Sequence, residues 1–347
     1  MADLIFITGG SGHIGYRVIL YALASGYRVR AAVRSKDRAE KIVSSPSIKA
    51  LGVDNDKDER LQFVEVPDLS SEDAYDEAIK DAQYAIHVAS PITASYKEGD
   101  DLVSHFMEPA LTGTMNLLKA AQKAGSVRRV VVTSSVVAII PWQSFTSGTS
   151  AEIFNEKNRI STPEGPFSNT FEAYAAGKTA ALNKAEAWLH SEKPSLELIH
   201  VFPGFVIGPN ELVTNVKDAL YGTNRSVLGP ILGEDGGRKP SSSIHVSDVA
   251  MAHVLALSPH INSHTNSGFI LSSEGLRGTR WEESLQLAKQ YFPNEVEQGI
   301  LPTAGTVGTL PVKIDASQTE KVLGLKLRSF EEQVKDILSY YVQLARG

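Results

Sequence analysis

Short runs of apolar residues recur along the first half of the chain and alternate with segments of helical periodicity. The runs are rich in β-branched residues and are mostly unbroken by charge, instead of alternating between apolar and polar positions. Unbroken runs of this kind are typical of strands buried on both faces, as in a parallel sheet. The pattern predicts strands at Leu4–Thr8, Arg28–Val33, Leu61–Val66, Tyr84–Val88 and Arg129–Thr133.

Helical periodicity fills the gaps between these strands. Ser70 or Ser71 can cap a helix whose first turn holds two carboxylates, and Gly125 follows another at the position of a left-handed C-cap. Regular strand–helix alternation predicts an α/β protein with a doubly wound, Rossmann-type parallel sheet. The helices are expected near residues 13–24, 36–44, 71–80 and 100–124.

A glycine-rich turn links the first predicted strand to the first predicted helix. It reads Thr8-Gly-Gly-Ser-Gly-His-Ile-Gly15 and satisfies both Gly-x-x-Gly-x-x-Gly and Gly-x-Gly-x-x-Gly. Glycine lets the backbone approach a pyrophosphate, and the helix N-terminus offers free N–H groups and a positive dipole end. Because strand and helix flank the turn as the motif requires, we expect dinucleotide binding instead of a plain strand–helix turn.

The end of the second predicted strand distinguishes between the two nicotinamide cofactors. NAD sites usually place an acidic residue there, yet this chain has none from Leu4 to Lys36. Arg34 stands at that end, and a guanidinium can bind a 2′-phosphate with two hydrogen bonds. We therefore predict NADP(H), with Arg38 as a second cation if the next helix begins near Lys36. The alternative is that Arg34 is a solvated surface charge.

Two further strand ends are candidates for cofactor contacts. Asp68 and Leu69 follow the third strand, where they can contact an adenine or can simply form a helix-entry turn; position leaves both interpretations open. Ala89 and Ser90 follow the fourth strand, and such small residues let the cofactor backbone pass.

The later part of the chain is less regular. Residues 141–170 are rich in Ser, Thr, Pro, Gly and Asn and are expected to run over the surface before a helix near 171–190 and a strand at Leu196–Phe202. We predict a Rossmann-type NADP-binding domain over 1–205, to which 241–260 returns, and a mainly substrate-binding lobe over 206–347. Helices are expected in this lobe and beside it at 247–257, 281–292, 315–323 and 329–344.

Composition excludes several classes of function. The net charge is −6 and the charges are interspersed, which speaks against binding of nucleic acid or of a membrane surface. The chain has no cysteine, so disulfides and thiolate chemistry are excluded, and its nine histidines show no metal-ligand spacing. Residues 1–7 lack a basic region, and no apolar stretch is long enough to span a bilayer. A soluble cytoplasmic protein without a metal is expected.

The candidate chemistry is concentrated in one Tyr-x-x-x-Lys motif, Tyr174 and Lys178. On a helix this spacing puts both side chains on one face, one turn apart. A neighbouring ammonium is expected to lower the pKa of the phenol and make it a general acid for a carbonyl oxygen that receives a hydride. The alternative is a surface pair without chemistry. A serine at the end of the fifth strand, Ser134 or Ser135, could polarise the carbonyl.

With these residues placed, the chain resembles the extended short-chain dehydrogenase/reductases. More narrowly, it is similar to the dihydroflavonol-reductase-like branch, which includes fungal carbonyl reductases and yeast methylglyoxal reductase. The resemblance covers nearly the whole length. It is carried by TGGSGHIG (8–15), AVRS (32–35), PDLS (67–70), HVASP (87–91), EPALTGTMNLLKAA (108–121), VVTSSVVA (131–138), YAAGK (174–178), PGFVIGP (203–209) and IHVSDVAMAH (244–253).

The resemblance implies an NADPH-dependent reduction of a ketone or aldehyde, a small-molecule substrate, and a monomer or homodimer. It selects Ser135 over Ser134 to orient the carbonyl, with Tyr174 as proton donor and Lys178 on the nicotinamide ribose. Asn116 is a candidate for a fourth polar group. The implied cofactor contacts are Gly9, Ser11, Gly12, His13, Ile14, Arg34, Arg38, Asp68, Leu69, Ala89, Ser90, Tyr174, Lys178, Pro203 and Val206.

Two alternatives share parts of this pattern. Epimerases and hydroxysteroid dehydrogenases of the same broad class also use Ser, Tyr and Lys, but an epimerase typically retains NAD, against which Arg34 counts. A non-catalytic NADP-binding regulator is the other alternative, against which the intact Tyr174 and Lys178 pair counts.

Overall fold

The computed structural model describes residues 2–53, 59–91 and 96–347. Contacts between backbone positions divide the chain into two compact units. This division does not show what either unit binds. The cofactor-binding and substrate-binding roles of the two domains therefore stay predictions. The first unit comprises Met1–Ala138, Arg159–Phe202 and Ala250–Phe269, and the second comprises Ile139–Asn158, Pro203–Val249 and Ile270–Gly347.

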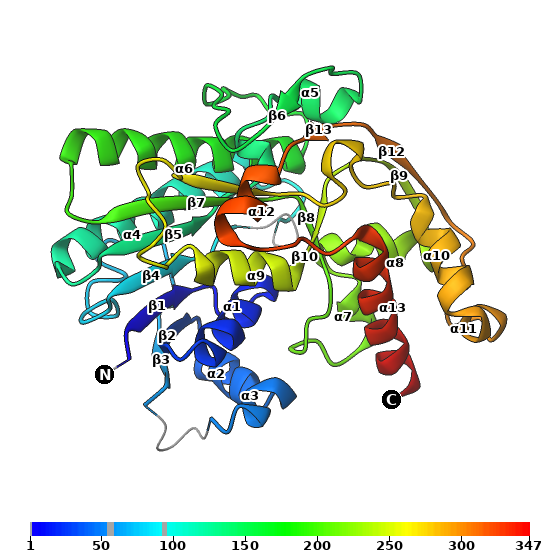
Figure 1. The fold of residues 1–347 in the computed structure, drawn as a ribbon, viewed down its shortest axis with the longest axis horizontal. Helices are drawn as coiled ribbons and strands as arrows, with labels where there is room; N and C mark the ends of the chain where they lie inside the picture. The colour runs from blue at the N-terminus through cyan, green and yellow to red at the C-terminus, as the bar shows by residue number, and fades with distance from the viewer. Residues whose placement is uncertain (1, 54–58, 92–95) are drawn as a thin grey trace. The chain divides into compact units, whose positions relative to one another are not determined.

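A seven-stranded sheet with the order β11-β7-β5-β4-β1-β2-β3 forms the centre of the fold (Figure 1). The strand pairs from β3 across to β7 are all parallel, with Ile5 of β1 opposite Val29 of β2 and Tyr84 of β4. The predicted α/β class with a Rossmann-type parallel sheet is therefore confirmed. The strands are β1 (Leu4–Thr8), β2 (Arg28–Val33), β3 (Leu61–Glu65), β4 (Tyr84–His87), β5 (Arg129–Thr133), β7 (Glu197–Pro203) and β11 (Gly268–Leu271).

Helices cover both faces of this sheet. Figure 1 shows α4 (Glu108–Ala124) and α6 (Thr170–Glu192) on one side, with α1 (His13–Ala24) and α2 (Lys36–Val43) on the other. Alternate residues of the strands form a core with α4 and α6, because successive side chains of a strand point to opposite faces. This core includes Leu4, Phe6, Val130, Val132, Leu117, Leu118 and Trp188.

The predicted helix at 71–80 is wrong, because this segment forms a series of turns. The Asp68 carboxylate accepts a hydrogen bond from the Ser70 backbone N–H at 2.8 Å, which closes the chain into a turn. Asp73 then has a φ of 61°, outside the helical region. Tyr75 and Ile79 are both buried and stand at the spacing of apolar residues in a helix, although the backbone between them is not helical.

Residues 141–170, expected as a surface excursion, contain α5 (Trp142–Ser147) and β6 (Ile153–Phe154). Strand β6 pairs with β13 (Lys313–Ile314), about half the chain away in sequence. A two-residue strand whose partner is so distant leaves no local pattern from which to predict it.

The second unit has its own core around Trp281, which is fully buried. The indole packs edge-to-face on Phe205 and Phe330, with ring centroids 5.6 and 5.5 Å away. Helix α13 (Phe330–Arg346) begins with a capping box of Ser329 and Glu332, which satisfies the backbone N–H groups of these two residues. Besides β6 with β13, this unit contains the strand pairs β8 (Phe205–Ile207) with β10 (Ser243–His245), and β9 (Asp235–Pro240) with β12 (Thr306–Leu310).

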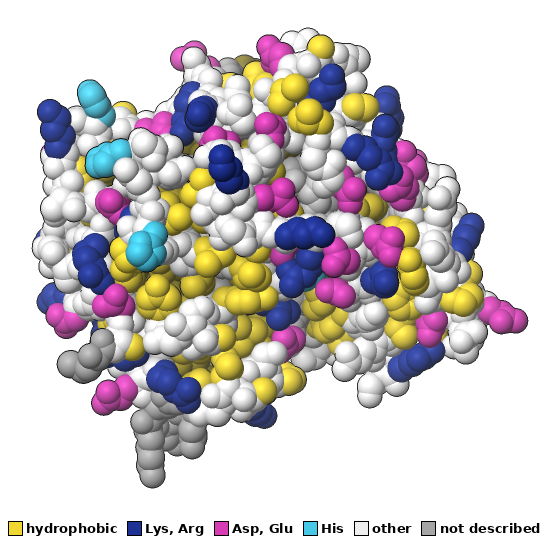
Figure 2. All heavy atoms as spheres, in the orientation of Figure 1, with side chains coloured by type: hydrophobic (Ala, Val, Ile, Leu, Met, Phe, Trp, Pro, Cys, Tyr) yellow, Lys and Arg dark blue, Asp and Glu magenta, His cyan; other side chains and the backbone are white. Residues whose placement is uncertain are grey.

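The remaining helices are mostly short. Over the part of the chain that the structure describes, no helix combines the length and apolarity that crossing a membrane requires. On the face shown in Figure 2, positive and negative side chains are interspersed. The helices are α3 (Pro46–Ala50), a π-helix (Val103–Met107), α7 (Val216–Ala219), α8 (Arg225–Ile231), α9 (Val246–Leu255), α10 (Glu283–Tyr291), α11 (Pro293–Glu297), α12 (Ser317–Leu323) and α13 (Phe330–Arg346), with single 3₁₀ turns at Val136–Ala138, Gly222–Asn224 and Gly275–Arg277.

Candidate functional site

The glycine-rich turn between β1 and α1 is shaped by close backbone contacts. Gly9 has a φ of +71°, and a Cβ there would lie 2.7 Å from the backbone nitrogen of Ala89. A Cβ on Gly15 would overlap the carbonyl oxygen of Gly9. Larger residues at either position would therefore displace the turn.

The start of α1 fits an anion such as the pyrophosphate of a dinucleotide. Gly12 is the N-cap residue, no side chain caps the helix, and no acidic residue stands in its first turn. Its first N–H groups and the positive end of its dipole thus carry no anionic partner from the helix itself. Of the predicted contacts, Ser11 lies in the glycine-rich turn, and His13 and Ile14 lie in the first turn of α1.

The ends of β1 and β4 are joined by hydrogen bonds. The Ala89 N–H donates to the Thr8 hydroxyl oxygen at 3.3 Å, and that oxygen lies 2.8 Å from Nδ1 of His87. Ala89 and Ser90 therefore lie directly beside the glycine turn. This is where the sequence predicted that small residues let the cofactor pass.

Arg34 and Arg38 are both exposed, the first just after β2 and the second in the first turn of α2. Among the described residues neither arginine forms an ion pair. Two cations at the end of β2, without an acidic neighbour on that strand, match the charge of a 2′-phosphate.

In the structure, the Asp68 side chain stabilises the turn that follows it. Besides the Ser70 N–H, its carboxylate accepts a hydrogen bond from the Ser71 hydroxyl at 3.3 Å. The Asn116 amide holds the same loop, because it donates to the carbonyl oxygens of Leu69 and Ser71 at 3.3 and 2.9 Å. Asn116, a candidate for the fourth polar group, is thus committed to the loop after β3. Adenine contacts of Asp68 and Leu69 stay a prediction.

Helix α6 positions the two candidate catalytic side chains. Asn169 caps the helix by accepting hydrogen bonds from the N–H groups of Phe171 and Glu172, both at 3.0 Å. Between the candidate residues, Gly177 permits close packing, since a Cβ there would lie 2.8 Å from the Phe106 carbonyl oxygen. Tyr174 and Lys178 then follow one turn apart on the same helix.

Ser135, just beyond the end of β5, is near enough to Tyr174 to act on the pKa of its hydroxyl. Burial raises the pKa of Tyr174 to about 12, and the Ser135 side chain partly offsets this rise. The Lys178 nitrogen lies 5.9 Å from the centre of the Tyr174 ring. The expectation that this ammonium would bring the pKa below that of a free phenol is wrong, because burial dominates.

Lys178 is buried and donates a hydrogen bond to the Thr133 carbonyl oxygen at 2.9 Å. Thr133 is itself held by a contact of 2.7 Å between its hydroxyl oxygen and Nε2 of His253. Burial lowers the pKa of Lys178 to about 8, so its ammonium form still predominates at neutral pH.

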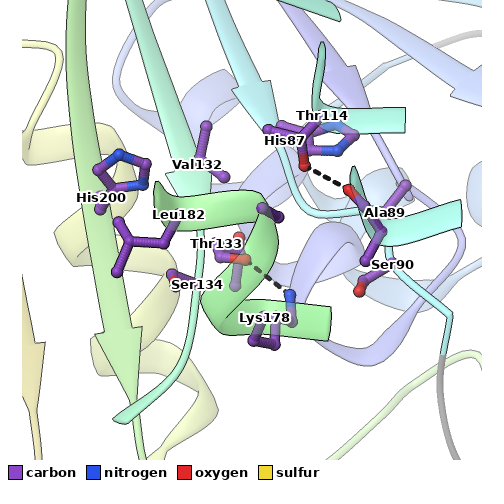
Figure 3. A pocket seen from close by; sticks show the side chains of 12 residues that line it. His87, Ala89, Ser90, Thr114, Val132, Thr133, Ser134, Lys178, Leu182 and His200 are labelled. Atoms are coloured by element: carbon purple, nitrogen blue, oxygen red, sulfur yellow. Dashed lines mark hydrogen bonds between the residues drawn. The ribbon is translucent and has the colours of Figure 1, made fainter. Parts of the chain in front are cut away.

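Figure 3 shows the side chains that line the same cavity as Lys178. Thr133 and Ser134 come from β5 and its end, His87 from β4 and His200 from β7. Neither His87 nor His200 was predicted from the sequence to line this cavity. A signal was present, because each is the one histidine in an otherwise largely apolar strand.

Two predicted cofactor contacts, Pro203 and Val206, belong to the second unit. Their role over a nicotinamide stays a prediction. All the other predicted site residues belong to the first unit.

Comparison with known proteins agrees with this architecture. Residues 5–267 match the family described as NAD dependent epimerase/dehydratase. The chain is 36% identical to "Ketoreductase CTB6" of Cercospora beticola, over 99% of this chain and 96% of that one. It is 26% identical to "Putative NADPH-dependent methylglyoxal reductase GRP2" of Candida albicans, over 97% of this chain and 98% of that one.

Among solved structures, yeast methylglyoxal/isovaleraldehyde reductase Gre2 complexed with NADPH superimposes with a TM-score of 0.80 at 26% identity, over 99% of each chain. The expected similarity to extended short-chain dehydrogenase/reductases is confirmed. The sheet order, the glycine turn and the match over residues 5–267 together show that the chain belongs to the NAD dependent epimerase/dehydratase family.

Proposed function

We propose that this protein reduces a ketone or aldehyde to an alcohol, with NADPH as the hydride donor. The observation that carries the proposal is the placement of Tyr174 one helical turn from a buried Lys178, whose ammonium is held on the Thr133 carbonyl oxygen at 2.9 Å and lies 5.9 Å from the centre of the Tyr174 ring. The ketoreductase and methylglyoxal reductase names of the relatives support the same reaction. When bound, NADPH would supply a hydride to the carbonyl carbon.

Tyr174 supplies the proton that completes the reduction. The C=O π bond opens as hydride adds to carbon, and the oxygen takes the hydroxyl proton of Tyr174 to give CH–OH. A phenol with a pKa of about 12 is protonated at neutral pH, which is the form that a proton donor needs. The proton then returns to the phenolate from solvent.

Ser135 and Lys178 make this transfer easier. The Ser135 hydroxyl can donate to the developing negative charge on the carbonyl oxygen. The Lys178 ammonium lowers the free energy of the phenolate that Tyr174 becomes during transfer. Both effects increase as the transition state develops, so both favour kcat more than substrate binding.

Arg34 and Arg38 would select NADPH over NADH through its 2′-phosphate. The NADPH bound to Gre2 and the NADPH dependence in the name of the Candida relative support this choice. The glycine turn and the uncapped start of α1 would hold the pyrophosphate.

Oxidation of NADPH over a panel of aldehydes, α-ketoesters and aryl ketones tests the proposal. We expect turnover on members of this panel, and a loss of about 10²–10⁴-fold in Tyr174→Phe with NADPH binding retained. Tyr27→Phe, a half-buried tyrosine of the same unit, is the matched control and should keep its rate. NADPH binding without turnover on any carbonyl would favour a non-catalytic regulator instead.

A further inference from the structure

The carboxyl end of β5 is held by side chains from two different helices. The hydroxyl oxygen of Thr133, the last residue of the strand, lies 2.7 Å from Nε2 of His253, which belongs to α9. The carbonyl oxygen of the same threonine accepts the hydrogen bond of 2.9 Å from Lys178 of α6 (Figure 3). All three residues belong to the first unit. Thr133 thus connects a buried histidine to the candidate catalytic lysine.

The two contacts reach Thr133 from opposite faces of the sheet. Val130 and Val132 point into the core that the strands form with α4 and α6. Successive side chains of a strand point to opposite faces, so the Thr133 hydroxyl lies on the face away from α6. His253 therefore holds the strand end from one face, while Lys178 reaches its backbone from the helix on the other.

Thr133 depends on such an anchor because the sheet supports it on one side only. The pairing of β5 with β4 ends at Val132, whereas β7 still pairs with Thr133 at Val201. The Ser134 N–H donates to the Val201 carbonyl at 2.8 Å, so the Thr133 carbonyl points the opposite way, toward β4. There the ladder has ended, and the hydrogen bond to this oxygen comes from Lys178.

The contact between Thr133 and His253 is buried. His253 is 0% exposed and Thr133 is 7% exposed, so bulk water does not compete for it. A single histidine in an apolar run such as 250–255 is most often an ordinary core residue. Here its ring nitrogen lies at hydrogen-bond distance from the residue that binds the lysine, which gives it a further effect.

We propose that His253 is a positioning residue for Lys178 and acts through Thr133. By holding the Thr133 hydroxyl, His253 keeps the carbonyl oxygen of the same residue where the Lys178 ammonium can donate to it. That hydrogen bond stabilises the charged form of the lysine. Without His253 the strand end can shift, the ammonium loses part of this stabilisation, and Lys178 titrates at lower pH. For turnover this consequence rests on the proposed function, whereas the titration of the lysine does not.

The other titratable side chains around Lys178 change charge in different ranges of pH. Burial lowers the pKa of His87 on β4 to about 3, and the charge of Lys178 adds to this effect. Burial also lowers the pKa of His200 on β7, which lines the same cavity, to about 4. It raises the pKa of Tyr174 on α6 to about 12. Of these four groups, Lys178 alone titrates near pH 8.

The ¹³C-NMR titration of the lysines, with the Lys178 signal assigned by Lys178→Arg, tests the proposal without turnover. In His253→Leu and in Thr133→Val, the titration of Lys178 should shift down by about half a unit, because a hydrogen bond to a charged group is weakened. In His253→Gln it should stay close to wild type, since an amide can either donate to the Thr133 hydroxyl or accept from it. Titrations that coincide with wild type in both apolar variants would overturn the proposal.

A double variant shows whether the two residues act through one contact. Thr133→Val combined with His253→Leu should shift Lys178 no further than either change alone, because each single change already breaks that contact. The double variant removes both partners of the contact, so neither is left buried without the other, and it serves if a single variant fails to fold. Shifts that add would contradict a path through Thr133.

Thr179→Val is the matched control. Thr179 is buried and follows Lys178 on α6, but its hydroxyl donates within the helix to the Ala175 carbonyl at 3.0 Å. This variant should keep the wild-type titration of Lys178. An equal shift in Thr179→Val would overturn the assignment to the strand end.

The pH profile of kcat/KM gives a third readout. Its upper limb should move down by about half a unit in His253→Leu and should stay in place in His253→Gln. Lower thermal stability of His253→Leu without any movement of the limb would assign the residue to packing alone and overturn the proposal. Absence of carbonyl turnover, with the shift in the NMR titration present, would count against the proposed function alone.

Discussion

At the scale of single residues, burial moves the pKa values of the two candidate catalytic groups in opposite directions. Tyr174 rises to about 12 and Lys178 falls to about 8. Below pH 8 the phenol and the amine are therefore both protonated. This is the state in which Tyr174 can give up a proton while a positive charge stands beside the phenolate that remains.

The pH dependence of reduction follows from these values. We expect kcat/KM to stay level from near neutral pH up to about pH 8 and then to fall, because Lys178 loses its charge there. In Lys178→Arg the side chain stays charged, so the fall near pH 8 should disappear, whatever the remaining rate. Lys184→Arg, an exposed lysine on the same helix, should keep the wild-type profile. A rate that climbs through pH 8 would exclude Lys178 as the group responsible.

Cofactor choice is also decided by single residues. Arg34→Ala should raise the KM for NADPH by at least about tenfold, since a hydrogen bond to a charged phosphate is lost, and should leave the KM for NADH nearly unchanged. Arg28→Ala is the matched control, because Arg28 stands at the opposite end of β2 and donates to the Ala2 carbonyl. Steady-state kinetics with both cofactors separates the two variants. Equal losses with NADPH and NADH would contradict the phosphate contact.

At the scale of elements, the parallel strands could be predicted because a strand buried on both faces leaves an unbroken apolar run. The paired strands β9 and β12 could not, since Gly236, Gly237 and Pro240 interrupt any such run and the partner lies far away in sequence. Local spacing was also insufficient at 71–80, where Asp68 and Asp73 turn the backbone out of a helix.

In the candidate site, too, some residues could be predicted from the sequence and others could not. Tyr174 and Lys178 could be predicted because their spacing on one helix has a physical meaning. Choosing Ser135 required the resemblance to a family, and in the structure Ser135 acts on the pKa of Tyr174. The place of His200 beside the cavity could not be predicted from the sequence, because it depends on β7 lying beside β5.

Arg129, at the start of β5, connects separate elements. We expect it to contribute more to the free energy of unfolding than its neighbour Arg128. Its buried guanidinium donates to the carbonyls of Ala256, Ser258 and Ile261, beyond the end of α9, at 2.6–2.7 Å. It also pairs with Glu197 of β7. Replacing it would leave the buried carbonyls of Ala256 and Ile261 without this donor.

In urea unfolding, Arg129→Met should lower the free energy of unfolding by about 3 kcal/mol. Arg128→Met supplies the comparison, because Arg128 is exposed and pairs with Asp3, and it should cost less than about 1 kcal/mol. Similar losses in the two variants would show that the contacts of Arg129 add nothing to stability.

At the scale of the whole molecule, two buried histidines make stability sensitive to acid. Their pKa values in the folded protein are about 3 for His87 and about 4 for His200, against 6.5 for a free side chain. The unfolded chain therefore binds protons at a higher pH than the folded chain does. The free energy of unfolding should fall as the pH drops from about 6.5 toward 4.

Urea midpoints at pH 7, 6 and 5 measure this dependence. His200→Gln should flatten it, because one of the two buried imidazoles is gone, even if the variant is less stable at pH 7. His264→Gln removes an exposed histidine and should leave the slope as it is in wild type. Parallel slopes in all three proteins would show that His200 does not resist protonation.

The first unit is built from three separate segments of the chain, which has a consequence for synthesis on the ribosome. The carbonyl acceptors of Arg129 lie 127 to 132 residues downstream of it, and β11, which borders β7, comes later still. Until they emerge, a guanidinium destined for burial lacks its acceptors and β7 is an open edge onto which another nascent chain can pair. The greatest risk of misassembly therefore falls between the synthesis of β7 and that of β11, when most of the sheet already exists.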